Sequence, residues 1–135
     1  IQRESMAYFI NHVHIRAKYP EQSAKWYEKH FDCKTISSKE VIPGTITIAM
    51  EAGGDTRLNI SSQPEGSSDT TRPAELNILG LEHFGFGTDD IEADITRFKN
   101  SGVRIVLPST TIPGGAKIAF IEGPDQVLIE LVQSP

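Results

Sequence analysis

The chain has 135 residues, of which 38% are hydrophobic, and a net charge of −5 at pH 7. This length suits one compact domain with its own core. The acidic balance argues against nucleic acid or a membrane surface as partner, and no apolar run approaches the roughly 20 residues that a membrane-spanning helix needs. We expect a cytoplasmic protein that binds neither nucleic acid nor a membrane. The chain starts at Ile1 instead of methionine, which indicates that it has been trimmed or processed.

The first half of the chain predicts one helix and four strands. After a polar leader over residues 1–7, alternation predicts a strand over residues 9–17. A helix over residues 23–31 follows, because apolar residues recur there near helical spacing. Three more strands, separated by Pro-Gly and Gly-Gly pairs, are expected over residues 34–42, 45–51 and 56–61. The single cysteine, Cys33, excludes an intrachain disulfide and is expected to be a half-buried small residue, not a nucleophile.

The second half predicts the same order of elements. Residues 62–79 are rich in Ser, Thr, Pro and Glu, and form the expected linker. A strand is then predicted over 81–87 and a helix over 91–99, followed by strands over 103–107, 116–122 and 126–132. The prediction is two β-α-β-β-β units, over residues 8–61 and 80–133, within one compact domain.

Three sequence echoes support this division into two similar units. His83 repeats His12 at an offset of 71 positions, each on an opening strand. Residues 112–120 repeat residues 42–50 at an offset of 70, and residues 128–131 repeat residues 57–60 at an offset of 71. Because the echoes keep one order and nearly one offset, they indicate one supersecondary unit used twice.

Strand alternation predicts which side chains share a face of the sheet. Val13 and Ile15 should pack against the helix, so the intervening histidines point away from it. The same parity assigns further polar side chains to this open face, although Lys117 is equally well explained as a solvated lysine at a strand edge. The predicted open-face residues are His12, His14, Thr47, Arg57, Asn59, His83, Lys117 and Glu130.

Three of these residues form a candidate metal site. Two neutral imidazoles and one carboxylate, from His12, His83 and Glu130, suit a divalent metal that keeps open positions for substrate or water. A single strand histidine is usually structural, but the repeated placement favours ligation, and a metal would explain a carboxylate on an apolar strand. Asn59 suits a water or a substrate oxygen as well as a metal. His14 is a pocket residue or an alternative ligand to His12.

These features resemble the vicinal oxygen chelate superfamily, which includes glyoxalase I, methylmalonyl-CoA epimerase, fosfomycin-modifying enzymes, extradiol dioxygenases and bleomycin-binding proteins. The resemblance covers residues 11–132 and depends on the opening His-Val-x-Ile strand, on Trp26-Tyr27-Glu28-Lys29, and on Gly123-Pro124-Asp125 before Ile129-Glu130-Leu131. It implies an α+β fold in which the two units pair into an open, curved sheet of about eight strands with helices outside. Gln126 departs from the family pattern, which usually has glycine there.

The resemblance also implies a chemistry. His12, His83 and Glu130 match the metal ligands, Asn59 takes the fourth-ligand position, and the metal would be Zn, Ni, Co, Mn or Fe. Chelation of vicinal oxygens then stabilises an enediolate-type oxyanion, and Glu130 is also the general base. The expected activity is a glyoxalase-like lyase or isomerase acting on a small-molecule substrate, in a protein that forms a homodimer.

Other members of the superfamily stay open as alternatives. Asn59 is one methylene shorter than the residue that glyoxalase I and the epimerase use there, and Gly44 replaces a second base of the epimerase. No basic cluster follows Glu130 to bind the phosphonate of fosfomycin. Two histidines and one carboxylate are also the Fe(II) oxygenase pattern, so an extradiol-type dioxygenase remains possible. A metal-free binding protein of the bleomycin resistance type is the alternative from a different functional class.

Overall fold

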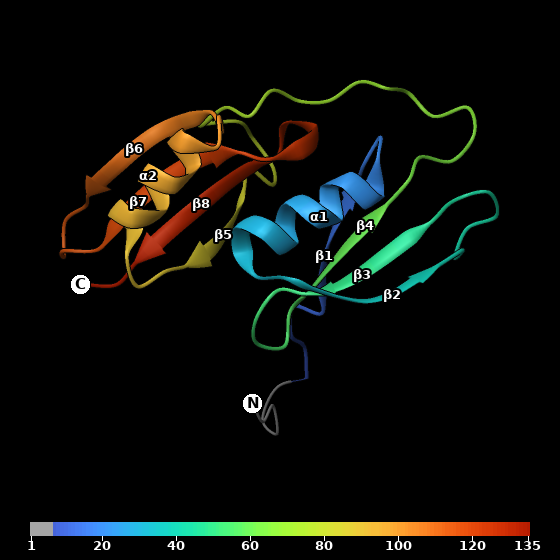
Figure 1. Cartoon of the computed structure of the whole chain (residues 1–135), viewed down its shortest axis with the longest axis horizontal. Coiled ribbons are helices and arrows are strands. Elements are labelled where there is room, and N and C mark those ends of the chain that lie inside the picture. The colour runs from blue at the N-terminus through green and yellow to red at the C-terminus, as the bar shows by residue number, and fades with distance from the viewer. Residues whose placement is uncertain (1–6) are drawn as a thin grey trace. The chain divides into compact units, whose positions relative to one another are not determined.

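The computed structural model describes residues 7–135 and divides the chain into two compact units, Ile1–Asp69 and Thr70–Pro135. The division falls within the predicted linker over residues 62–79. The predicted polar leader, apart from residue 7, lies outside the described residues. Each unit has one helix and one four-stranded sheet in the order β-α-β-β-β, and each is described below by itself (Figure 1).

The first unit has a mixed sheet with the strand order β1-β4-β3-β2. Strand β1 runs parallel to β4, and the other neighbours are antiparallel. The elements are β1 (His12–Arg16), α1 (Pro20–Phe31), β2 (Lys34–Lys39), β3 (Thr47–Glu51) and β4 (Arg57–Ser61).

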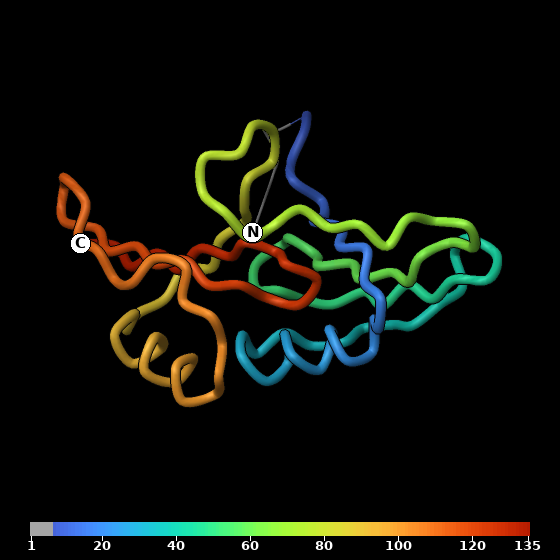
Figure 2. Tube along the Cα trace, turned by 90° about the horizontal axis from the view of Figure 1, so that it is seen from above, coloured from blue at the N-terminus to red at the C-terminus, as the bar shows by residue number. Residues whose placement is uncertain are grey.

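Helix α1 covers one face of this sheet, as the trace in Figure 2 shows. Its buried side includes Ala24 and Tyr27, and the sheet contributes the buried side chains of Ile15, Met50 and Ile60. Burial of these apolar side chains is the main stabilising contribution to the unit.

The second unit has the equivalent order β5-β8-β7-β6, again with one parallel pair, β5 and β8. A short 3₁₀ turn, η1 (Pro124–Gln126), leads into the last strand. The other elements are β5 (Phe84–Gly87), α2 (Ile91–Asn100), β6 (Ile105–Thr111), β7 (Lys117–Glu122) and β8 (Leu128–Gln133).

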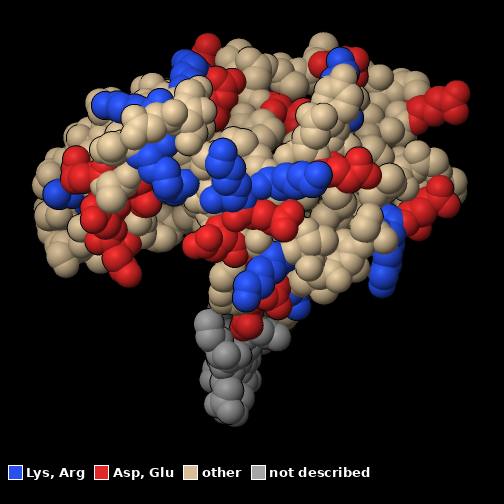
Figure 3. All heavy atoms as spheres, in the orientation of Figure 1, with Lys and Arg blue, Asp and Glu red and all other residues tan. Residues whose placement is uncertain are grey.

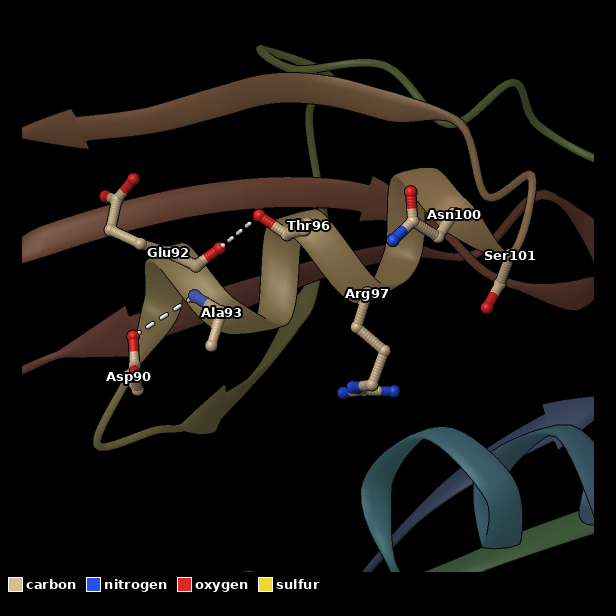
Figure 4. Close-up of a pocket in the computed structure, with 7 residues that line it drawn as sticks. All are labelled: Asp90, Glu92, Ala93, Thr96, Arg97, Asn100 and Ser101. Atoms are coloured by element: carbon tan, nitrogen blue, oxygen red, sulfur yellow. Dashed lines mark hydrogen bonds between the residues drawn. The ribbon is translucent and has the colours of Figure 1, made fainter.

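Helix α2 begins with a side-chain cap and packs through one apolar stripe. The Asp90 carboxylate accepts a hydrogen bond of 3.1 Å from the Ala93 N–H, which satisfies one of the free donors of the first turn (Figure 4). The helix buries the side chains of Ile91, Ile95 and Phe98. The sheet below it contributes the buried side chain of Ile129.

The opposite face of the second sheet is partly covered by the end of the predicted linker. Ala74 is 1% exposed and packs in one cluster with Phe120 and Leu128. Leu76 packs against the same cluster. Residues 70–83 therefore belong structurally to the second unit and do more than connect the two units.

The predicted α+β class, the order of elements and the total of eight strands are confirmed for the described residues, as two four-stranded open sheets. Several predicted ends are wrong. Strand β1 starts at His12, because its partner β4 starts at Arg57, which pairs with His12. Strand β5 starts at Phe84 instead of residue 81, and β6 is shifted towards the C-terminus.

Two surface properties bear on partners. No helix in residues 7–135 is long and apolar enough to cross a membrane. On the face drawn in Figure 3, Lys and Arg side chains are interspersed with Asp and Glu.

Candidate metal site

The open face of the first unit carries most of the polar side chains that alternation predicts for it. Ile15 is buried on the α1 side, whereas His12 and His14 are exposed on the other side. The parallel register pairs His12 with Arg57 and His14 with Asn59. Thr47 pairs with Ser61 on the neighbouring strands and shares this face.

The hydrogen bonds on this face distinguish the two histidines. The Nδ1–H of His12 donates to the side-chain oxygen of Asn11 at 2.9 Å, which leaves Nε2 for another partner. His14 instead uses Nε2, which lies 2.8 Å from the hydroxyl of Ser61, and that hydroxyl lies 2.7 Å from Oγ1 of Thr47.

The environment of His14 also favours its neutral form. Burial lowers the pKa of His14, and the positive charge of Arg16 and the His12 ring lower it further. Ser61, 2% exposed, was not predicted from the sequence, because a serine at a strand end carries no distinctive signal.

In the second unit the structure brings His83 and Glu130 together. Nε2 of His83 lies 3.4 Å from Oε1 of Glu130, and the two side chains are 29% and 19% exposed. The His83 ring also packs edge-on against Phe120, with 4.9 Å between ring centroids. Phe120 pairs with Glu130 across β7 and β8, so it forms the apolar floor next to this pair.

Gly85 allows the Glu130 carboxylate to occupy this position. Gly85 pairs with Glu130 across β5 and β8. A Cβ at Gly85 would lie 3.3 Å from Cβ and 3.4 Å from Oε1 of Glu130. Any larger residue would therefore force Glu130 to shift by a few tenths of an ångström.

A further acidic residue, Glu82, contacts the site and was missed by the sequence analysis. The Nδ1–H of His83 donates to Oε1 of Glu82 at 2.7 Å. The backbone N–H of Asn77, and then the His83 ring, hold the pKa of the Glu82 carboxyl below its usual value. Neighbours on a strand point to opposite faces, so alternation predicts no contact here. The contact forms because both residues precede the start of β5.

The predicted position of Lys117 on the open face is wrong. Lys117 pairs with Gln133, whose side-chain oxygen accepts a 2.8 Å hydrogen bond from the Ile91 N–H at the start of α2. Both residues therefore lie on the helix side of the sheet. The sequence echo behind this prediction has an offset of 70, whereas the strand registers make Ala49 equivalent to Phe120, at an offset of 71. A displacement of one residue moves a side chain to the other face of the sheet.

The donor pair in the second unit fits a divalent metal. Ligand atoms about 2.1 Å from a tetrahedral metal are separated by about 3.4 Å, and the His83–Glu130 separation is 3.4 Å. A neutral imidazole nitrogen and a carboxylate are also suitable donors for Zn²⁺, Ni²⁺, Co²⁺, Mn²⁺ and Fe²⁺. In the described part of the chain, no three His, Cys, Asp or Glu side chains are grouped to hold a metal ion, so the fit depends on this pair alone. His12 belongs to the first unit.

A separate hollow runs along the exposed side of α2 (Figure 4). All of its lining residues come from this helix and its two ends, and none of them is a predicted site residue. They are Asp90, Glu92, Ala93, Thr96, Arg97, Asn100 and Ser101. Since it is wide open and distinct from the His83–Glu130 pair, we assign it no ligand.

The chain is similar to several known proteins. It is 30% identical to the uncharacterized protein YwbC of Bacillus subtilis over 95% of this chain and 99% of that protein. It is 28% identical to a lactoylglutathione lyase of Neisseria meningitidis over 90% of this chain and 88% of that enzyme.

Solved structures show the same fold. A glyoxylase/bleomycin resistance protein/dioxygenase domain from Frankia matches 96% of this chain and 100% of its own, with a TM-score of 0.78 at 16% identity. Leishmania major glyoxalase I matches 94% of this chain and 87% of its own, with a TM-score of 0.70 at 19% identity. The profile of one family matches residues 9–131, and the chain therefore belongs to the Glyoxalase/Bleomycin resistance protein/Dioxygenase superfamily.

Proposed function

We propose that this protein is a metal-dependent lyase or isomerase of the glyoxalase type that acts on a small molecule with vicinal oxygens. The observation that carries the proposal is the His83–Glu130 pair, whose 3.4 Å separation suits two ligands of one metal. The 28% identity to a lactoylglutathione lyase over most of both chains supports the same class of reaction.

In this proposal His12, His83 and Glu130 hold the metal, and Asn59 is a fourth ligand or a substrate contact. His12 keeps Nε2 available by using Nδ1 for Asn11. Bound metal of this kind supplies a Lewis acid that stabilises negative charge on substrate oxygens.

The protein's own residues perform the other steps. A carboxylate oxygen of Glu130 takes a proton from one substrate carbon and returns it to the neighbouring carbon. Phe120 keeps water away from one side of this carboxylate. His14 and Thr47, linked through Ser61, and Arg57 line the substrate side in the first unit.

Metal binding and turnover test the proposal together. Purified protein would be titrated with Zn²⁺, Ni²⁺, Co²⁺, Mn²⁺ or Fe²⁺, and thioester formation would be followed in a lactoylglutathione assay. We expect binding of one metal per chain and turnover, with both lost in His83→Ala and in Glu130→Ala. Lys117→Ala, on the other face of the sheet, is the matched control and should behave like the wild type.

Two results would contradict the proposal in different ways. Oxygen consumption that depends on Fe²⁺ with a catecholic substrate, without isomerase turnover, would identify a dioxygenase. Absence of binding for every metal would leave a small-molecule binding protein of the bleomycin resistance type.

We also propose a homodimer, as the resemblance implies. In the proposed dimer, the partner subunit would cover two large apolar side chains close to His83 in sequence, Leu79 and Leu81, which are 93% and 73% exposed. Sedimentation velocity should give twice the mass of one chain, and a monomer at all concentrations would contradict the proposal. Cytoplasmic location stays a prediction.

A further inference from the structure

Glu82 connects His83 to the segment that covers the second sheet. Its Oε1 accepts the hydrogen bond from Nδ1 of His83 at 2.7 Å. Its Oε2 accepts a hydrogen bond of 2.5 Å from the backbone N–H of Asn77. Both carboxylate oxygens are therefore held by the protein, and the orientation of Glu82 is set by the fold.

Asn77 is itself fixed in place. Its φ is 70°, in the left-handed region that asparagine tolerates better than most residues. Three residues earlier, Ala74 is 1% exposed in the cluster with Phe120 and Leu128, so the segment is anchored to the sheet. The N–H of Asn77 therefore approaches Glu82 from a packed segment.

This arrangement selects one tautomer of His83. A carboxylate only accepts hydrogen bonds, and Nδ1 lies 2.7 Å from Glu82, whereas Nε2 lies 3.4 Å from Glu130, so the shorter contact places the proton of a neutral His83 ring on Nδ1. The lone pair is then on Nε2, which is the nitrogen that lies 3.4 Å from Glu130. A histidine ligand commonly has its second nitrogen held in this way, which fixes the ring and raises its basicity.

We propose that Glu82 is a positioning residue that fixes the tautomer and the ring orientation of His83, so that Nε2 faces a metal shared with Glu130. The inference rests on the proposed function for its metal. Its structural part, the tautomer, concerns the metal-free protein and is measured independently.

The first experiment determines the tautomer by ¹⁵N NMR of the His83 ring in metal-free protein, at about pH 8.5, where an ordinary histidine is neutral. We expect the proton on Nδ1 in the wild type. Glu82→Gln should keep it there, because the amide oxygen of glutamine still accepts a hydrogen bond. Glu82→Ala should shift the ring towards protonation on Nε2. Glu75→Ala, an exposed glutamate in the same covering segment, is the matched control.

The second experiment titrates the same four proteins with Zn²⁺ alone. Loss of such a supporting carboxylate usually weakens metal affinity by about 10- to 100-fold. We expect this loss in Glu82→Ala, partial recovery in Glu82→Gln, and wild-type affinity in Glu75→Ala. The recovery in Glu82→Gln separates positioning from a general loss of folding.

The outcomes distinguish the two proposals. Equal Zn²⁺ affinity in the wild type and Glu82→Ala, or a wild-type proton on Nε2, would overturn the role of Glu82 and leave the proposed function intact. No Zn²⁺ binding by the wild type, with the proton on Nδ1, would overturn the metal role of Glu82 together with the proposed function.

Discussion

The histidines on the two open faces use their ring nitrogens differently. His12 and His83 each commit Nδ1, to Asn11 and Glu82, whereas His14 commits Nε2 to Ser61. In both repeat-equivalent histidines Nε2 is therefore left to bind a metal. This observation favours His12 over His14 as the ligand in the first unit, an alternative that the sequence left open.

The assignment predicts different results for two neighbouring variants. His12→Ala should weaken Zn²⁺ binding by more than about 100-fold, the upper end of the loss for a supporting residue. His14→Ala should leave Zn²⁺ affinity unchanged, because its ring is bonded to Ser61. Titration calorimetry measures both. The reverse pattern would make His14 the ligand.

Cys33 should be unreactive in the folded protein. Burial, then the carboxylates of Asp32 and Glu28, raises the pKa of its thiol from 9.0 to about 11. Only the thiolate is nucleophilic, so a shift of this size lowers the reactive fraction about 100-fold at pH 8. Alkylation by iodoacetamide should therefore be at least that much slower in the native protein than in urea. Equal rates would show that the thiol is accessible.

Gln126 has a backbone conformation that explains why its family usually has glycine. Its φ is 59°, in the left-handed region, although its side chain accepts a hydrogen bond from Thr71. Gln126→Gly and Gln126→Ala both remove this bond, but only alanine keeps the strain. We expect Gln126→Gly to be more stable than Gln126→Ala by about 1 kcal/mol in urea unfolding. Equal stability would mean that the turn carries no strain.

The sequence predicts individual site residues where a simple period or the internal repeat applies. His12, His14 and Asn59 are on the expected face because they lie within regular strands. Glu82 was missed because it precedes β5, and Lys117 was assigned to the wrong face by a one-residue displacement. Contacts between residues outside regular strands depend on the path of a loop, which no period encodes.

At the scale of elements, local signals predicted one helix start better than the other. Asp90 caps α2, and the helix begins at Ile91, which is the predicted start. Helix α1 has no side-chain cap and begins with Pro20, three residues before the predicted start. Proline suits this first position, because the N–H that it lacks would have no partner inside the helix.

The Asp90 cap should contribute measurably to stability. Asp90→Ala removes the acceptor of the Ala93 N–H and should lower the free energy of unfolding by about 1 kcal/mol. Asp89→Ala, at the preceding exposed position, keeps the cap and should cost much less. Urea unfolding of both variants measures the difference. An equal loss would assign the effect to charge near the helix start, not to the hydrogen bond.

At the scale of the whole molecule, the internal repeat could be predicted from the sequence because each unit must bury the same kind of apolar surface. Each helix covers one face of its own sheet, and the opposite face carries polar side chains in the first unit and the packed segment over residues 70–83 in the second. The packing of residues 70–83 on the second sheet could not be predicted from the sequence. The apolar residues that anchor it, Ala74 and Leu76, are too few to stand out in a polar segment.

Metal binding by the folded chain should stabilise the whole protein against unfolding. The proposed ligands lie far apart in the sequence and are not assembled in an unfolded chain. A ligand that binds only the folded state raises the free energy of unfolding by about 2.7 kcal/mol at a concentration of 100 Kd. We expect this rise in urea unfolding with Zn²⁺, and its loss on chelation or in either His12→Ala or His83→Ala. A rise that persists in His12→Ala would show that His83 and Glu130 bind the metal without His12.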